Sequence, residues 1–179
     1  MSGTATKSSR TPSSQANMSG MRVYSELYPI ETVSLRYFNV YGPRQRPDSM
    51  YAAVIPKFIA ALRAGESPTV HGDGLQSRDF AFVADVVRAN ILAATAPGEA
   101  CSGKAYNIAG GSEQSLMEML GILNEVLGTS VQPTHTDPRA GDVRHSYADL
   151  SQAKADLGYE PSITFADGLA RTVAWFADR

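Results

Sequence analysis

Apolar and polar residues along the chain form short apolar runs separated by longer amphipathic stretches. Three runs, residues 32–40, 80–83 and 105–109, are predicted to be strands, and the first is expected to be buried on both faces. Residues 53–64 carry apolar side chains at helical spacing and stop just before Gly65, so they predict a helix. Strands that alternate with helices predict an α/β fold.

Side chains with capping potential mark further helix starts. Ser115 with Glu118, and Thr164 with Asp167, have the spacing of a capping box and predict two helices that begin there. Asp85 is predicted to cap another helix, which runs to about residue 94. Each of these predictions rests on local sequence alone.

The ends of the chain are organised differently. Residues 1–20 are rich in Ser and Thr and have almost no large apolar side chains, so burial cannot offset their ordering entropy and disorder is predicted. Residues 22–28 predict the end of a helix that is stopped by Pro29. Residues 151–157 predict a short helix. One globular α/β region is therefore expected over residues 21–179.

Composition narrows the classes of function. Of 179 residues, 43% are hydrophobic and the net charge is −2, which gives no electrostatic case for binding nucleic acid or an anionic membrane. No apolar run approaches the ~20 residues of a membrane span. The single cysteine, Cys101, cannot form an internal disulfide and favours a reducing compartment, which predicts a cytoplasmic protein. His71 has no second His or Cys near it, so no metal site is predicted.

The richest segment is residues 35–46, Leu-Arg-Tyr-Phe-Asn-Val-Tyr-Gly-Pro-Arg-Gln-Arg. An apolar strand that stops at Gly42-Pro43 and continues into polar residues is typical of an α/β ligand crevice, where loops at the carboxyl ends of strands hold the substrate. The segment resembles the extended short-chain dehydrogenase/reductase family, the NAD-dependent sugar-nucleotide epimerases and dehydratases. The resemblance implies a Rossmann-type fold, of which this chain supplies a few sheet strands and a small mixed α/β substrate-binding subdomain.

Other segments resemble the same family in the same order, across about residues 22–179. They are Val54-Ile-Pro-Lys-Phe-Ile59, Val70-His-Gly-Asp-Gly74, Gln76-Ser-Arg-Asp-Phe80, Val83-Ala-Asp-Val-Val87, Tyr106-Asn-Ile-Ala109, Arg139-Ala-Gly-Asp142, Tyr147-Ala-Asp149 and Leu157-Gly-Tyr159. Within the family the pattern is most similar to UDP-glucose 4-epimerases and their relatives acting on UDP-N-acetylglucosamine or UDP-glucuronate. Residues 38–40 favour epimerases over dehydratases. Family members are often homodimers.

The resemblance implies a set of residues that bind a UDP-sugar. Guanidinium groups pair bidentately with diphosphate oxygens and stay charged at any working pH, which suits Arg78 and Arg139 to that role. The other substrate-binding positions are Asn39, Ala53, Val54, Thr69, Val70, His71 and Asp142. Phe38 falls where the family touches the nicotinamide end of NAD.

Each of these positions also has a purely structural interpretation. Arg78 and Arg139 could be surface arginines paired with the neighbouring Asp79 and Asp142. Asn39 could satisfy backbone groups at the end of its strand, and Phe38 could be an ordinary core aromatic.

The chain departs from the family where the chemistry should begin. The family's tyrosine base and the lysine four residues after it align with Arg10 and Ser14, and no tyrosine in the chain is followed by a lysine at that spacing. No glycine-rich dinucleotide turn is present either. No catalytic residue is therefore assigned, and NAD is expected for the family but not for this chain alone.

Three interpretations stay open. The chain is expected to be the C-terminal, substrate-side part of an epimerase, a truncated or frame-shifted product whose residues 1–20 lie outside the family sequence. A non-enzymatic nucleotide-sugar-binding or interaction module is the second. The third is a split enzyme completed by a separate NAD-binding half.

Overall fold

The computed structural model describes residues 12–46, 54–139 and 141–177 and has an α/β fold. The helices are α1 (Pro12–Leu27), α2 (Val54–Ala64), α3 (Val83–Thr95), α4 (Gly98–Cys101), α5 (Leu116–Leu127), α6 (Ser151–Leu157) and α7 (Phe165–Ala177). The strands are β1 (Val33–Tyr37), β2 (Thr69–His71), β3 (Ser77–Asp79), β4 (Lys104–Ile108), β5 (Glu113–Ser115), β6 (Thr134–Thr136) and β7 (His145–Ser146).

Three small sheets organise these strands. β1 and β4 pair in parallel over their whole length, with Val33 opposite Lys104. β2 and β6 form a second parallel pair. In the third sheet β3 lies between β5, to which it is antiparallel, and β7, to which it is parallel.

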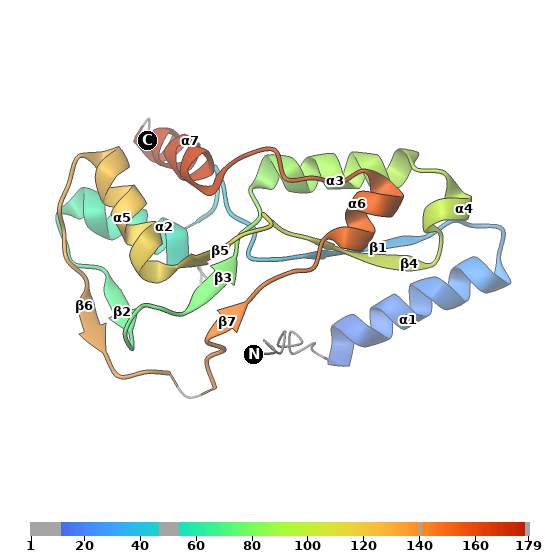
Figure 1. Cartoon of the computed structure of the whole chain (residues 1–179), viewed down its shortest axis with the longest axis horizontal. Coiled ribbons are helices and arrows are strands. Elements are labelled where there is room, and N and C mark those ends of the chain that lie inside the picture. The colour runs from blue at the N-terminus through green and yellow to red at the C-terminus, as the bar shows by residue number, and fades with distance from the viewer. Residues whose placement is uncertain (1–11, 47–53, 140, 178–179) are drawn as a thin grey trace.

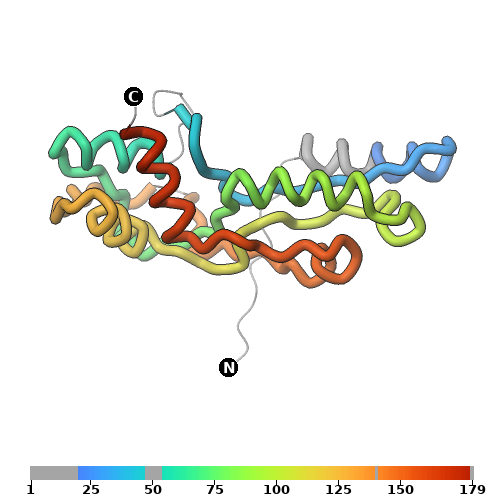
Figure 2. The backbone as a smooth tube through the Cα atoms, turned by 90° about the horizontal axis from the view of Figure 1, so that it is seen from above, coloured from blue at the N-terminus to red at the C-terminus, as the bar shows by residue number. Residues whose placement is uncertain are grey.

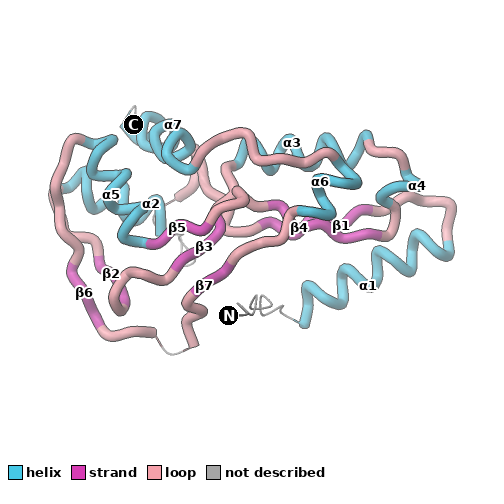
Figure 3. Tube along the Cα trace, viewed as in Figure 1, coloured by secondary structure: helices cyan, strands magenta, loops and turns pink. Residues whose placement is uncertain are grey.

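The elongated molecule has two lobes, each with its own apolar cluster (Figures 1 and 2). The α2–α5–α7 lobe is built around buried side chains of those helices together with residues 41, 70, 80 and 82. The β1–β4 lobe packs Tyr106 and Ile108 of β4 against buried side chains of α3, α4 and α6 and against Tyr159. Figure 3 shows that the strands of the third sheet lie between the two lobes.

The amphipathic helix expected at residues 53–64 is confirmed as α2, although residue 53 lies outside the described part of the chain. The capping box at Ser115 is confirmed in both directions, since its hydroxyl accepts from the Glu118 backbone and Glu118 accepts from the Ser115 backbone. At Thr164, the hydroxyl accepts from the Asp167 backbone at 3.1 Å before α7. Local capping chemistry thus fixes these helix starts.

The N-terminal segment is described only in part, so the boundary expected at residue 20 stays a prediction. Residues 12–20, expected to be disordered, form the first part of α1, and residues 1–11 lie outside the described residues. The helix ends at Leu27, as the pattern before Pro29 predicted. α1 contacts β1, so packing against the sheet supports a segment whose own sequence carries few apolar side chains.

The strand predicted at residues 80–83 is also misplaced. The strand is Ser77–Asp79, and Phe82 makes only an isolated bridge with Tyr41. Phe80 and Phe82 instead pack edge-on against the Tyr41 ring, with centroids 6.1 and 5.5 Å away. The apolar run at residues 80–83 is therefore apolar because it packs in the core. The polar residues before it, Ser77–Asp79, form the strand that pairs with β5 and β7.

Asp85 does not cap α3. The N-cap residue is Phe82, which makes no side-chain capping bond. Asp85 lies inside the first turn, where it is buried and accepts hydrogen bonds from the Ser162 backbone and hydroxyl at 3.0 and 2.7 Å. Its carboxylate thus holds the segment between α6 and α7 against α3.

β1 is not buried on both faces, contrary to expectation. No residue of β1 is fully buried, and Tyr37 is 46% exposed. Among the described residues β1 pairs only with β4, and Phe38 N donates to Ile108 O on that side. By strand alternation the Tyr37 N–H points to the opposite, unpaired edge.

This edge predicts self-association, because unpaired strand groups beside apolar side chains are a template for pairing with another chain. We expect size-exclusion chromatography to give species larger than the 19.2 kDa monomer and thermal melting to begin at low temperature. Tyr37→Lys should shift the profile towards monomer, whereas Tyr28→Lys, which adds the same charge at an exposed tyrosine outside the strand, should not. A monomer that melts cooperatively above about 60 °C would contradict this prediction.

Candidate functional site

A cavity of about 600 Å³ lies in the α2–α5–α7 lobe, where the carboxyl end of β1 meets α2, β2 and β3. Its lining includes most of the residues predicted from sequence, namely Asn39, Val54, Thr69, His71, Arg78, Arg139 and Asp142. Val70 is fully buried and is not part of the lining, and Ala53 lies outside the described residues. Phe38 is half-buried and is not part of the lining. The substrate-binding roles of these residues stay predictions.

Arg78 reaches the cavity because of where it lies in β3. Ser77 and Asp79 on either side of it are buried, so strand alternation turns Arg78 to the opposite face. Its Nη1 donates to Ser77 O at 2.8 Å and its Nη2 to Asp142 Oδ1 at 2.5 Å. The expected structural partner, Asp79, is therefore not the carboxylate that pairs with Arg78.

Arg139 and Asp142 lie on the same turn. The Asp142 backbone N–H donates to Arg139 O at 3.2 Å, and both residues line the cavity. The Arg78–Asp142 ion pair thus joins this turn to β3 across 64 positions of sequence. With Lys57 and Glu66, the lining holds three basic side chains and two acidic ones, and this excess of basic side chains suits an anionic ligand.

Asn39 has an unusual backbone. Its φ is +34°, in the left-handed region that non-glycine residues rarely adopt. Its side-chain Nδ2 donates to Asp79 O at 2.7 Å. The structural interpretation of Asn39, a side chain that satisfies a backbone group at the strand end, is therefore what the structure contains, and the same residue borders the cavity.

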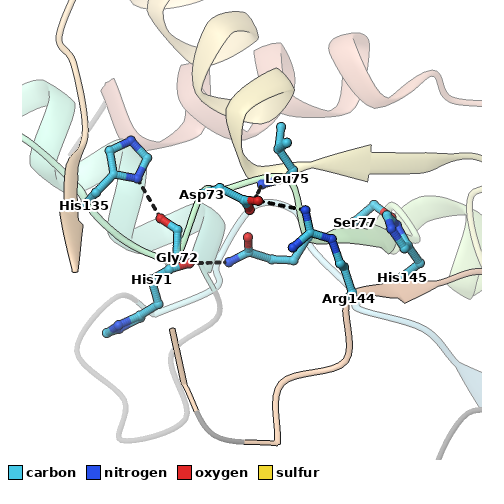
Figure 4. Close-up of polar contacts among 9 residues, drawn as sticks. His71, Gly72, Asp73, Leu75, Ser77, His135, Arg144 and His145 are labelled. Carbon is cyan, nitrogen blue, oxygen red and sulfur yellow. Dashed lines mark hydrogen bonds and ion pairs between the residues drawn. The ribbon is translucent and has the colours of Figure 1, made fainter. Parts of the chain in front are cut away.

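Polar contacts hold the turn between β2 and β3 (Figure 4). His135 Nδ1 lies 2.7 Å from Gly72 O, and Gln76 Nε2 donates to His71 O at 2.9 Å. Asp73 pairs with Arg144 at 2.7 Å, which ties the turn to the segment between Arg139 and β7. His71 itself contacts Thr136 Oγ1 at 2.8 Å. In the described ranges no group of His, Cys, Asp and Glu has the arrangement of a metal site.

The apolar wall of the cavity includes side chains that the sequence analysis did not select. Tyr41, Phe58, Phe80 and Leu116 supply it, together with the aliphatic part of Lys57. Burial, followed by the charges of Asp85 and Asp167, raises the pKa of Tyr41 above its ordinary value. The phenol therefore stays protonated near neutral pH and donates to Phe165 O at 3.3 Å. Of these residues, Lys57 and Phe58 could have been selected from the sequence, because both belong to the motif at residues 54–59.

The two positions that the resemblance aligns with the family's base and lysine are Arg10 and Ser14. Arg10 lies outside the described residues, and Ser14 lies in α1, which packs on the β1–β4 lobe. No described helix has the length and apolar character needed to cross a membrane.

Comparison with known proteins defines the class. Residues 13–109, somewhat more than half of the chain, match the NAD dependent epimerase/dehydratase family. The chain therefore belongs to this family, and its α/β architecture is that of the family's Rossmann-type members. The sequence-based assignment of family and fold class is confirmed.

Individual relatives are similar over most of this chain. A putative UDP-glucose 4-epimerase of Methanocaldococcus jannaschii is 38% identical over 155 residues, 87% of this chain and 48% of that protein. A dTDP-glucose 4,6-dehydratase of Actinoplanes sp. is 37% identical over 155 residues, 86% of this chain and 46% of its own length. The structure of Thermotoga maritima UDP-glucose 4-epimerase with UDP-glucose matches with a TM-score of 0.84 at 35% identity, over 92% of this chain and 52% of that one. The chain spans about half the length of the relatives it matches.

Proposed function

We propose that this chain is the nucleotide-sugar-binding part of an NAD-dependent UDP-sugar 4-epimerase and binds a UDP-sugar in the cavity. The observation that carries the proposal is that Arg78, Arg139 and Asn39 border one cavity at the carboxyl end of β1. Its volume of about 600 Å³ lies in the range typical of small-molecule sites. We expect this function in the cytoplasm, in keeping with the single free cysteine.

The chemistry of the lining supports a diphosphate ligand. Arg78 is already held on one side by Ser77 O and presents its fork towards Asp142. A diphosphate carries more negative charge than one carboxylate. It would therefore replace Asp142 as the partner of the Arg78 guanidinium and would also pair with Arg139, which lines the same cavity. Asp142, released from that pair, would then accept hydrogen bonds from sugar hydroxyl groups.

The residues of this chain do not fit NAD. None of the described strand-to-helix connections carries the glycine-rich turn that lets a helix N-terminus approach a pyrophosphate, and the full sequence contains no such pattern. Phe38, the position expected to meet the nicotinamide, does not border the cavity. We therefore assign no step of hydride transfer to these residues and infer that an NAD-binding half outside them would supply the cofactor.

A binding module without catalysis is the second candidate. The absence of a tyrosine followed by a lysine four residues later favours it, because the family's proton transfer needs that pair. Residues 38–40 favour the epimerase branch over the dehydratase branch, although relatives of both kinds are similar to the chain. Both candidates share the UDP-sugar site and differ in whether this region belongs to an epimerase or acts as a binding module alone.

Isothermal titration with UDP tests the site. We expect Arg78→Ala and Arg139→Ala each to weaken UDP binding by about 10- to 100-fold, since hydrogen bonds to charged groups contribute ~1.5–3 kcal/mol each. Arg22→Ala is the matched control, because it removes the same charge from an exposed position on α1. UDP that binds with the same affinity to all three variants would exclude this cavity as the diphosphate site.

A further inference from the structure

Asp79 is a fully buried carboxylate that the proposed function does not use. It is 0% exposed and follows Arg78 at the end of β3. No lysine or arginine pairs with it among the described ion pairs, whereas Arg78 pairs with Asp142. A buried carboxylate of this kind has to be stabilised by hydrogen bonds from its surroundings.

Backbone amides from the other lobe supply those hydrogen bonds. Gly110 N and Gly111 N, just after β4, donate to Asp79 Oδ1 at 2.8 and 3.1 Å. Ala148 N, in the segment that leads to α6, lies 3.4 Å from Asp79 Oδ2. The Asp79 side chain therefore connects β3 to two segments of the β1–β4 lobe, the one after β4 and the one before α6.

The backbone of Asp79 makes the contact that matters for the cavity. Its carbonyl oxygen accepts the 2.7 Å hydrogen bond from Asn39 Nδ2. Asn39 sits at φ +34°, a conformation that costs free energy and persists only where the surroundings determine it. Asp79 is thus hydrogen-bonded to Asn39, which borders the cavity, and adjoins Arg78, which also borders it.

We propose that Asp79 is a positioning residue, whose buried carboxylate fixes the register of β3 against the β1–β4 lobe and thereby holds Asn39 and Arg78 at the distance a diphosphate needs. The proposal rests on the proposed function, because it names the residue that sets the geometry of that site. Anion recognition by a guanidinium fork is sensitive to displacements of about 1 Å, so a small shift of β3 should weaken binding without unfolding the chain.

The charge state of Asp79 makes the proposal testable by pH. Burial raises the pKa of Asp79 to about 6, partly offset by the amide donors, so the carboxylate is charged at pH 7.5 and largely neutral at pH 5. Tyr159 faces it from the β1–β4 lobe, and the pKa of Tyr159 is raised chiefly by burial and then by Asp85, with Arg88 acting in the opposite direction and Asp79 contributing least. Tyr159 therefore stays neutral over this pH range and donates to Ala109 O. On β5, Glu113, which also carries a carboxylate, is the residue that pairs opposite Asp79.

Asp79→Asn is the informative variant, because it keeps the shape and the Oδ1 acceptor but removes the charge. Its amide would face Ala148 N, donor against donor. We expect Asp79→Asn to weaken UDP-glucose binding about tenfold at pH 7.5, the effect of weakening one hydrogen bond to a charged group. Because the buried charge itself opposes folding at neutral pH, the melting temperature of this variant should fall little or even rise.

Asp85→Asn is the matched control. Asp85 is another buried aspartate with three donors, Ser162 N, Ser162 Oγ and Ile163 N, and it lies 3.6 Å from Arg88 Nη2. Unlike Asp79, which accepts from Asn39, it has none of the cavity-lining residues among these partners. The Asp85→Asn substitution should lower the melting temperature and leave the affinity for UDP-glucose unchanged. If Asp79→Asn also leaves the affinity unchanged, or if both variants lower it equally, Asp79 has no positioning role and the proposal is overturned.

The pH dependence of UDP-glucose affinity is a second test, because a residue with a purely structural role would not change it. Wild-type affinity for UDP-glucose should fall between pH 7 and pH 5 towards that of Asp79→Asn, so that the ratio of the two dissociation constants approaches one. UDP-glucose is the probe because its phosphodiester groups do not titrate in this range. His71, His135 and His145 are present in both proteins, so any effect that they have on binding cancels in the ratio. A ratio that does not change with pH would count against the proposal.

Ligand-free NMR separates this proposal from the proposed function. If the wild type binds no UDP-glucose at all, the proposed function fails while the coupling can still be measured. The Asn39 side-chain amide signals should shift with a midpoint near pH 6 in the wild type and stay constant in Asp79→Asn. Signals that are identical in the two proteins at every pH would show that Asp79 does not fix Asn39, and the proposal falls.

Discussion

The purified chain is expected to leave UDP-glucose unconverted, with or without added NAD. Epimerisation in this family requires a base to accept the hydroxyl proton and a bound NAD to accept the hydride. The loss of a general base alone typically costs ~10²–10⁴-fold in rate, and the loss of the hydride acceptor removes the route altogether. Tyr41, the tyrosine that borders the cavity in the described residues, cannot substitute, because its raised pKa keeps it protonated and it donates to Phe165 O.

An assay for UDP-galactose, coupled to its oxidation, measures this directly. A full-length epimerase, such as the Thermotoga maritima relative, serves as the positive control. Adding the NAD-binding half of such a relative should give conversion if the chain is one part of a split enzyme, and none if it is a binding module. Conversion by the chain alone that disappears in Arg78→Ala would contradict the prediction and place catalysis within these 179 residues.

Gly110→Ala is expected to destabilise the chain by about 1–3 kcal/mol, the usual range for forcing extra atoms into a packed site. A Cβ at this position would lie 2.2 Å from Phe80 O, which is a backbone atom and cannot rotate away. The same residue donates its N–H to Asp79, so relief of the clash would pull the two lobes apart at their junction. Thermal melting should show a decrease of several degrees, at roughly 2–4 °C per kcal/mol for a chain of this size.

Gly121→Ala is the matched control for the same chemical change. Gly121 is exposed within α5, and a Cβ there meets no atom within 4 Å. Replacing a glycine inside a helix by alanine stabilises by about 0.5–1 kcal/mol, so the melting temperature of this variant should rise. If both substitutions shift the melting temperature in the same direction, the close approach at Gly110 does not decide the stability of this junction.

Helices with local signals were the most predictable part of this fold. The capping box at Ser115, the amphipathic face of α2 and the stop before Pro29 each depend on residues within a few positions of one another. β3 was missed because its residues, Ser77 to Asp79, are polar and pair with β5 and β7, which come from 34 or more positions further along. Partners at that separation leave no mark on local periodicity.

The candidate site was predictable only through the resemblance. Arg78 and Asp142 are 64 positions apart, and nothing in composition or spacing would bring them into one cavity. Lys57 and Glu66 were missed because a charge on an exposed helix or turn looks the same whether or not a pocket lies beside it. The alternative that Asp79 pairs with Arg78 could not be excluded from sequence, since strand alternation, which turns neighbouring side chains to opposite faces, requires knowing that these residues form a strand.

The path of the chain between its two lobes has a consequence for folding. The chain leaves the β1–β4 lobe after β1, returns with α3, leaves again after β4, returns for α6 and ends in the other lobe with α7 (Figure 1). Neither lobe is therefore a continuous piece of sequence, and neither can be excised by cutting the chain once. Most of its organising contacts must close long loops first, which predicts slow folding and makes the two lobes gain and lose structure as one cooperative unit.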